Sequence, residues 1–424
     1  MPRPPRSVRP EDSFGNGWFG AVPSCRFATF RVALAVTTLV FHVPKFNAFI
    51  RDYTASAFHV PPAFGWLPIL TPTAGAALAV LQYVAAGGLL LGVGVPTCGW
   101  FLAATGFYIL LLDPEHYSHN AHFHLTLLAL VGCSRDGLSL ARLIRAAAAA
   151  ARCPAWPERL VRLQIGIVFF YAALDKVFSP FWGTSGTRLP ALLVVEHGLG
   201  LSMLQRLNQV VTRAAPAALS IATIALEFFL GAAAVFRPLW QTGLVVGFVF
   251  IAYLEFLVAP GLFTWDMFAS GILFLPAADG GWQVLLDPHC PSCRRRRTLL
   301  SGLDWLRRFR YVPREATAIS TGACPGLQLV SPRGQTLWGF DALRVQPAIL
   351  AGPAFVVMAV ARFGGGFLAA RGAGPWGALP YVLFAAYLAL WVPGVARHLG
   401  RPLHAALGTH ARAPRNLDPP SPPG

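Results

Sequence analysis

Two cysteines three residues apart could carry out thiol–disulfide chemistry. Cys290 and Cys293 follow residues 281–287, which favour a buried strand, and precede residues 294–309, whose pattern favours a basic amphipathic helix. The start of a helix and nearby arginines both stabilise a thiolate, so Cys290 is predicted to be a nucleophile. Cys293 is placed to resolve the mixed disulfide that this nucleophile would form.

A zinc knuckle is the alternative interpretation of the same cysteines. His289 and Cys324 could complete a set of four ligands with Cys290 and Cys293. A single CxxC lacks the second close pair that such sites usually carry, so the sequence favours a redox dithiol and no metal is predicted.

Lys176 is the second candidate for chemistry. It lies near the end of an apolar stretch, residues 160–182, beside Asp175, and only it and Lys45 are lysines among 34 basic residues. A partly desolvated ammonium can lose its proton and act as a base, whereas a guanidinium cannot. The alternative is a lysine that reaches the membrane interface beside a neutralising aspartate.

A histidine-rich stretch precedes the fourth apolar window. It contains six ionisable side chains: Asp113, Glu115, His116, His119, His122 and His124. Metal binding is one interpretation, because a spacing of three residues brings helical side chains together and imidazoles bind metals. The sequence has no second histidine cluster of the kind that a membrane di-iron site needs. We therefore favour pH-sensitive or substrate-facing groups, with His119 and His122 as substrate-binding candidates.

Three acids lie inside or at the edge of apolar windows, namely Glu227, Glu255 and Asp266. A buried acid without a partner is costly, so partners are expected among Lys176, Arg188 and the histidines. Such pairs would gather a polar cavity near the outer half of the bundle. Glu227 and Asp175 complete the predicted substrate-binding set.

The composition predicts a mainly α, polytopic membrane protein. The 424 residues are 55% hydrophobic and 12% charged, with a mean hydropathy of +0.54. The net charge of +16 comes from arginines in short segments that flank apolar windows, which fits membrane orientation and not nucleic-acid binding. Seven cysteines with one close pair do not form the disulfide framework of a secreted domain.

Apolar windows near bilayer length predict about eight spans and about two more near the C-terminus. The windows are residues 27–44, 70–94, 96–112, 121–134, 160–178, 215–236, 238–258, 260–277, 347–369 and 374–396. Assigning the arginines to sides places the N-terminus and the CxxC segment in the cytoplasm and Lys176 toward the outer face. We expect a multi-pass protein of the inner cell membrane whose dithiol rests reduced.

Three segments resemble the HTTM membrane domain, whose best-known relative is the vitamin K-dependent gamma-carboxylase. They read FRVALAVTTLVFH, HNAHFHLTLLAL and LQIGIVFFYAALDKVFSPFW. The resemblance covers about residues 20–277 and implies that Lys176 acts as a base on a reduced quinone. Ala121 and His122 compete for the position of a family histidine, and Tyr253 lies near the position of another. The large extra-membrane domain of the carboxylase has no counterpart, so the resemblance implies quinone or lipid chemistry, with carboxylation of glutamate not expected.

The segment around the CxxC is similar to the DCC family of thioredoxin-like thiol–disulfide oxidoreductases. The match is Asp287, Cys290 and Cys293, followed by a hairpin of two short predicted strands around a Pro-Arg-Gly turn and by a Gly-Phe-Asp-Ala segment at 339–342. The resemblance places Asp287 in the predicted catalytic set with the two cysteines. Residues 392–400 fit the tail of that family, although an apolar stretch separates them from the rest.

The predicted organisation has five parts. These are a disordered cytoplasmic leader (1–24), an HTTM-like bundle (25–277), a small thioredoxin-like α/β insert (278–345), a C-terminal transmembrane hairpin with a DCC-like tail (346–400) and a disordered tail (401–424). The predicted activity is thiol–disulfide or quinone-linked redox chemistry, with membrane lipids, a quinone or a thiol protein as partners. The alternative is a non-enzymatic transporter or lipid-binding scaffold, in which the acids and histidines form a proton or ion path.

Overall fold

A computed structural model describes most of the first 313 residues and short segments beyond them. The described residues are 18–55, 65–112, 118–134, 138–144, 152–179, 182, 215–257, 261–275, 282–286, 290–313, 328–330, 336–338, 352–353, 355–357 and 359.

The chain enters the bundle through one long helix with a widened turn. Helix α2 (Ser24–Thr37) continues through the π turn η2 (Thr38–His42) into α3 (Val43–Ala55). Single π turns inside α-helices are frequent at functional sites. Here the turn begins at Thr38 and ends at His42, and both side chains are buried.

Seven further helices and three short ones complete the described part of the bundle. They are α4 (Pro72–Leu91), α5 (Val95–Leu112), α6 (His119–Gly132), α7 (Leu140–Ile144), α8 (Trp156–Phe178), α11 (Pro216–Val235), η5 (Arg237–Leu239), α12 (Trp240–Leu257), α13 (Leu262–Gly271) and η6 (Ile272–Phe274). Local signals set the ends of α4, since Thr71 accepts a hydrogen bond from the Ala74 N–H and Gly92 adopts a φ of 79° just after the helix.

Close contact between helices depends on small residues. Helices α5 and α6 approach so closely that a Cβ on Gly99 would stand 2.6 Å from the Gly132 nitrogen. Small residues permit this approach between membrane helices, where packing and not the hydrophobic effect drives association.

Each of the eight N-terminal windows predicted from the sequence coincides with a helix. Among the described residues, four helices are long and apolar enough to cross a membrane: Ser24–Ala48, Pro72–Leu91, Val95–Leu112 and Ala217–Val235. Two shorter apolar helices are Thr242–Leu254 and Leu262–Phe274. The count of eight spans stays a prediction, and most of the two C-terminal windows lies outside the described residues.

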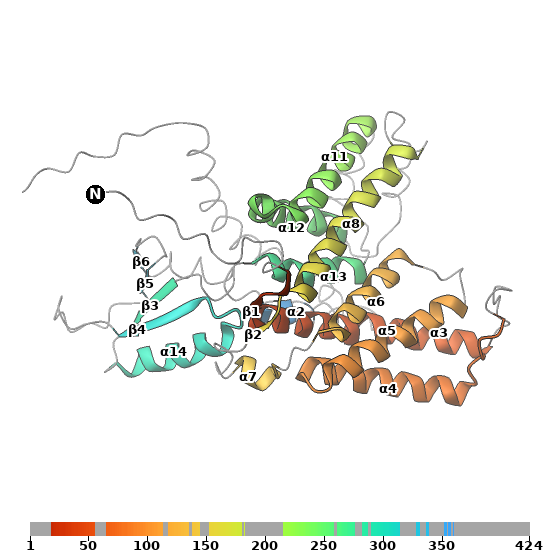
Figure 1. Ribbon diagram of the computed structural model, residues 1–424, viewed down its shortest axis with the longest axis horizontal. Helices are drawn as coiled ribbons and strands as arrows, with labels where there is room; N and C mark the ends of the chain where they lie inside the picture. The colour runs from red at the N-terminus through yellow and green to blue at the C-terminus, as the bar shows by residue number, and fades with distance from the viewer. Residues whose placement is uncertain are drawn as a thin grey trace, which may run out of the picture.

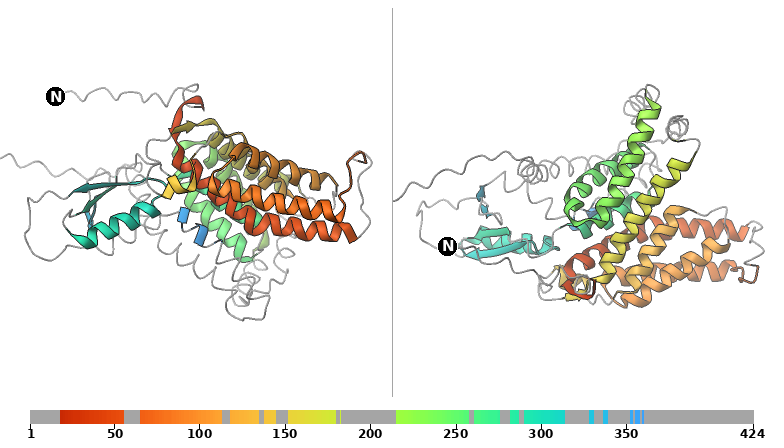
Figure 2. Two further views of the ribbon diagram at one scale, coloured as in Figure 1. Left: turned by 90° about the horizontal axis from the view of Figure 1, so that it is seen from below. Right: turned by 45° about the horizontal axis from the view of Figure 1, so that its top comes forward.

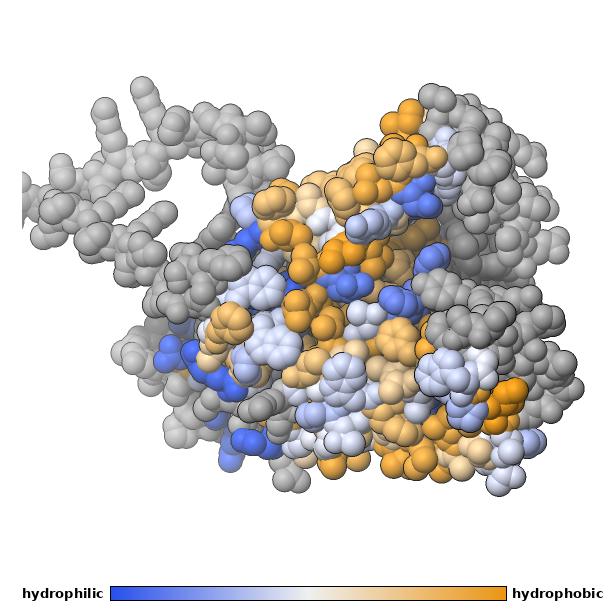
Figure 3. Space-filling model, turned by 45° about the vertical axis from the view of Figure 1, so that its right-hand side comes forward, coloured by the Kyte–Doolittle hydropathy of each residue, from blue (hydrophilic) through white to orange (hydrophobic). Residues whose placement is uncertain are grey.

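The surface of the bundle suits contact with lipid. Large apolar side chains such as Val80, Val84, Phe170 and Ile221 are exposed. Figure 3 shows apolar side chains gathered in patches on one face, with polar and intermediate side chains between them.

A small strand pair corrects the predicted leader. Strand β1 (Ala21–Pro23) pairs antiparallel with β2 (Arg152–Pro154), which leads into α8. Residues 21–23 therefore have a defined structure, because a segment distant in sequence supplies their hydrogen-bond partners. The remaining leader, residues 1–17, lies outside the described residues.

The insert is a four-stranded sheet with one helix. Its elements are β3 (Trp282–Leu286), α14 (Pro291–Leu303), β4 (Phe309–Pro313), β5 (Gln328–Val330) and β6 (Thr336–Trp338). The strand order is β4-β3-β5-β6, with β3 parallel to β4 and the other neighbours antiparallel. This confirms the predicted strand, helix and hairpin, and adds β4, which the sequence analysis missed.

The helix after the CxxC is shorter than predicted. It ends at Leu303 and not near residue 309. The Asp304 carboxylate accepts hydrogen bonds from the backbone N–H groups of Arg308 (3.0 Å) and Phe309 (2.8 Å), and Arg307 has a φ of 53°. This turn directs the chain into β4, which pairs with β3 along its whole length.

The insert lies at the end of the bundle where α2 begins (Figures 1 and 2). Trp305 packs with Cys25, Leu138 and Leu143 in one buried cluster, and an Arg307 guanidinium nitrogen donates to the Leu143 carbonyl. Helix α8 begins near this end of the bundle, and its final turn lies away from the insert (Figure 1).

Candidate functional site

Lys176 and Glu227 form an ion pair between α8 and α11. The Lys176 Nζ lies 2.9 and 2.8 Å from the two Glu227 carboxylate oxygens, and it also donates to the Ala172 carbonyl at 3.2 Å. The Trp182 ring centroid is 5.1 Å from the same nitrogen. The side chains are 16% and 8% exposed, so the pair is largely shielded while retaining some access. Neighbouring Asp175 is exposed.

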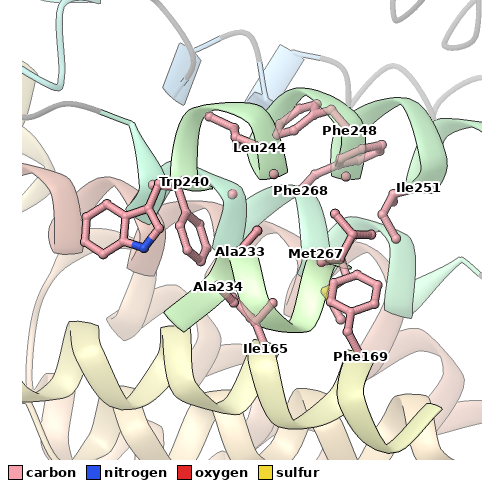
Figure 4. A pocket seen from close by; sticks show the side chains of 15 residues that line it. Ile165, Phe169, Ala233, Ala234, Trp240, Leu244, Phe248, Ile251, Met267 and Phe268 are labelled. Atoms are coloured by element: carbon pink, nitrogen blue, oxygen red, sulfur yellow. The ribbon is translucent and has the colours of Figure 1, made fainter. Parts of the chain in front are cut away.

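A partly open apolar cavity of about 60 Å³ lies deeper along the same two helices. Ile165 and Phe169 of α8 line it, with Leu230 of α11, Trp240 of α12 and Met267 of α13 (Figure 4). Residues 165, 169 and 176 are spaced by four and seven, so they share one face of α8. The cavity and the ion pair therefore follow each other along one helix face.

A second polar cluster lies in the centre of the bundle. The Nδ1 atom of His124 is 2.8 and 3.1 Å from the Asp266 carboxylate oxygens, and its Nε2 atom is 3.3 Å from the Thr38 hydroxyl oxygen. The rings of His42 and His124 have centroids 4.9 Å apart. His124, Asp266 and Thr38 are completely buried and His42 is 7% exposed.

A third cluster lies where α8 begins. Glu158 contacts Arg26 at 2.6 Å and Arg162 at 2.5 Å, and the Arg162 guanidinium stacks 3.9 Å from the centroid of Trp240. Glu158 and Arg162 are 2% and 6% exposed. This cluster joins α2, α8 and α12 at the end of the bundle that carries the insert.

The CxxC occupies the start of α14. Cys290 is the residue before the helix, is partly exposed, and its Sγ lies 3.0 Å from the Ser292 Oγ. Cys293 is one turn further, is 7% exposed, and packs in the insert core with Val284 and Leu329. No disulfide joins the two cysteines in this structure. Asp287 lies outside the described residues.

Residues 21–278 match the family described as the HTTM domain. This match covers more than half of the 424 residues. The chain belongs to the HTTM family. No curated protein and no solved structure matches it.

Within the HTTM domain, two predicted acid pairings are found. Glu227 pairs with Lys176, and Asp266 pairs with a histidine of the 113–124 stretch, His124. The single polar cavity expected around them is not observed among the described residues. Each pair involves different helices, and the cavity beside α8 and α11 is lined by apolar side chains with neither pair in its wall.

The other histidine candidates of the HTTM domain lie elsewhere on α6. His119 and His122 are exposed, and the His122 ring packs edge-on against Phe107 at 5.4 Å. A step of two residues turns a helix by more than half a revolution, so His124 faces the core while His122 does not. Glu255, Arg188 and His116 are not placed, since their side chains lie outside the described residues.

None of the four residues of the central HTTM cluster, Thr38, His42, His124 and Asp266, was in the predicted site set. The sequence signal for His42 was a histidine within the first apolar window, and for His124 it was membership of the histidine-rich stretch. Among the described residues, no group of three His, Cys, Asp or Glu side chains could hold a metal ion.

Proposed function

We propose that this HTTM protein is a membrane-anchored thiol–disulfide oxidoreductase of DCC type, with Cys290 and Cys293 as its redox pair. The observation that carries the proposal is the position of Cys290 directly before α14, with Cys293 one turn later. Strands β3 and β4 are parallel and α14 connects them, so the CxxC lies in a β–α–β unit. A CxxC beside such a unit is typical of thioredoxin-like redox proteins.

The two thiols have environments suited to different steps. Cys290 is accessible and lies at a helix start, with Arg294 and Arg297 exposed along the next two turns. Its thiolate attacks one sulfur of a substrate disulfide, a new S–S bond forms, and the released thiolate takes up a proton. The buried Cys293 then attacks the Cys290 sulfur as a thiolate and releases the second substrate thiol. The substrate gains two electrons, and the protein keeps a Cys290–Cys293 disulfide.

The test is alkylation of the full chain across a series of redox buffers, followed by mass measurement. We expect Cys290 and Cys293 to lose two hydrogens together in oxidising buffer. Cys290→Ser should abolish exchange with a substrate disulfide, and Cys293→Ser should trap the mixed disulfide on Cys290. Cys98→Ser, a cysteine of α5, is the control and should change nothing. If Cys290 and Cys293 never pair, the redox proposal is wrong.

The placement follows the arginine distribution. We propose a multi-pass protein of the inner cell membrane with its N-terminus and the CxxC insert in the cytoplasm, where a thiol protein is the expected partner. Single-cysteine labelling at Cys290 from each side of sealed vesicles tests this orientation. Labelling from the outer side alone would contradict it.

A second proposed activity uses the membrane domain, which we propose binds a quinone or a similar isoprenoid lipid. The supporting observation is the order along α8, where the Lys176–Glu227 pair follows an apolar cavity on the same helix face. A polar ring at the pair and an apolar tail in the cavity would satisfy both environments. Lys176 can serve as a base once its proton moves to Glu227, its partner at 2.8 Å.

Two variants separate binding from proton transfer. Gly247 lines the cavity, and a Cβ there would be 3.4 Å from Leu230, an ordinary contact, so Gly247→Ala is the control for Gly247→Leu, which fills the space. We expect Gly247→Leu to lose binding of an isoprenoid naphthoquinone. Lys176→Arg keeps the positive charge but removes a group that can act as a base. It should still bind the quinone but lose turnover of the reduced quinone. Unchanged turnover in Lys176→Arg would favour the alternative, a non-enzymatic transporter or lipid-binding scaffold.

A further inference from the structure

Hydrogen-bond geometry indicates how many protons the central His124–Asp266 pair carries. The Thr38 hydroxyl has one hydrogen and two possible acceptors, the Leu34 carbonyl at 2.8 Å and the His124 Nε2 at 3.3 Å. The shorter contact takes the hydrogen. Thr38 therefore accepts from His124, and the Nε2 atom of His124 carries a proton.

The other side of the ring then requires a second proton. Asp266 lies 2.8 Å from Nδ1, and two acceptors at that distance would repel each other. Either Nδ1 is protonated beside a carboxylate, or Asp266 is protonated and donates to Nδ1. Both arrangements contain two protons and have no net charge. A pair with zero exposure favours this neutrality, because an unpaired charge in the interior is expensive.

His42 packs against this pair and is the most exposed of the four side chains in the cluster. Its ring lies against that of His124, and it is 7% exposed while His124 and Asp266 are fully buried. Its Nε2 atom is buried without a hydrogen-bond partner among the described residues. Three residues further along the same helix, Lys45 is exposed. A ring that can accept a proton thus lies against the buried pair, one helical turn from the exposed Lys45.

We infer that Asp266 and His124 form a proton-binding site in the bundle core, holding one proton beyond a neutral imidazole and a carboxylate, and that His42 relays this proton to the surface near Lys45. The π turn η2 positions both contacts, because Thr38 and His42 are its first and last residues. The site is separate from the Lys176–Glu227 pair and from the dithiol, so it does not depend on the proposed function.

The proton count is tested by magnetic resonance on the full chain, labelled with nitrogen-15 in histidine and carbon-13 in the aspartate carboxyl. We expect a protonated Nε2 on His124 at neutral pH, with either a protonated Asp266 or a doubly protonated ring. A neutral His124 beside an ionised Asp266 would overturn the inference. Thr38→Val should shift the Nε2 signal. Thr37→Val is the matched control, because Thr37 is equally buried and its hydroxyl donates to the Ala33 carbonyl.

The relay is tested by the rate at which the shared proton exchanges after transfer into deuterated buffer. A positioned proton-transfer group typically contributes about a hundredfold or more, so His42→Phe should slow exchange by about that factor. His42→Gln, which keeps a polar side chain, guards against a folding defect and should also slow it. The control His122→Phe, at an exposed position of α6, should not. Equal exchange rates in all of these proteins would exclude His42 as the relay.

Discussion

The bundle and helix α14 of the insert place their charged groups in opposite ways. In the bundle, charged side chains such as Glu158 and Glu227 are buried, and each pairs with a basic side chain from another helix. In the insert, residues 294–297 are four exposed arginines, and the group buried beside them is the uncharged side chain of Cys293. Tertiary partners therefore govern the ionic chemistry of the bundle, whereas local position along α14 governs that of the dithiol.

The same contrast applies to packing. A Cβ on Gly99 would collide with the backbone of Gly132, whereas a Cβ on Gly302 in α14 would meet no atom within 4 Å. The membrane helices tolerate little change at their crossings. The insert helix has one packed face and open space along the rest.

The largest effect is expected from breaking the charge cluster at the start of α8. Glu158→Ala would leave Arg26 and Arg162 without their carboxylate, and removing one partner of a buried pair costs about 3–5 kcal/mol. Thermal unfolding in detergent measures the loss. Arg295→Ala, on the exposed face of α14, is the control and should change stability by about 0.5 kcal/mol or less. Similar losses in the two variants would remove the contrast between the regions.

A smaller effect is expected at the helix crossing. Gly99→Ala forces α5 and α6 apart and should cost about 1–3 kcal/mol, the usual range for overpacking. Gly302→Ala should instead be neutral or stabilising by up to about 1 kcal/mol, because alanine favours helix and nothing opposes its methyl group. Unfolding midpoints of the two variants provide the comparison. A stabilised Gly99→Ala protein would show that the crossing is looser than described.

The smallest effect at neutral pH is expected for Tyr311 in β4. Burial raises the pKa of its phenol above the ordinary value of 10.0, and its hydroxyl is buried without a partner among the described residues. The folded state thus disfavours the phenolate, so stability falls as pH rises above the ordinary pKa, where the unfolded chain ionises first. Tyr311→Phe should change stability at pH 7 by about 0.5 kcal/mol or less and weaken the alkaline decline. Unfolding measured at stepwise pH checks this expectation. An alkaline decline in Tyr311→Phe equal to that of the unchanged protein would contradict the assignment.

Much of the fold follows from apolar periodicity. The eight N-terminal windows became helices because long apolar runs have few alternatives when every backbone group must be bonded within the membrane. The strand, helix and hairpin of the insert were also predicted. Strand β4 was not, because the turn at Asp304 depends on backbone N–H groups four and five residues later, which a helical pattern in the sequence does not reveal.

The candidate sites divide in the same way. That Glu227 and Asp266 needed partners followed from the cost of burying an acid. The identity of those partners did not follow from the sequence. The paired residues lie 51 positions apart in one pair and 142 positions apart in the other. The histidine-rich stretch indicated polar function, but only the rotation of α6 selected His124 over His122.

The sequence by itself determined a membrane protein, the places of its helices and a CxxC at a helix start, because these depend on local composition and spacing. The tertiary structure decided that Lys176 meets Glu227, that an apolar cavity lies beneath them, and that Thr38 and His42 enclose the His124–Asp266 pair. These contacts depend on how helices far apart in the chain pack and turn against each other. Their energies arise only once water and lipid are excluded from between them.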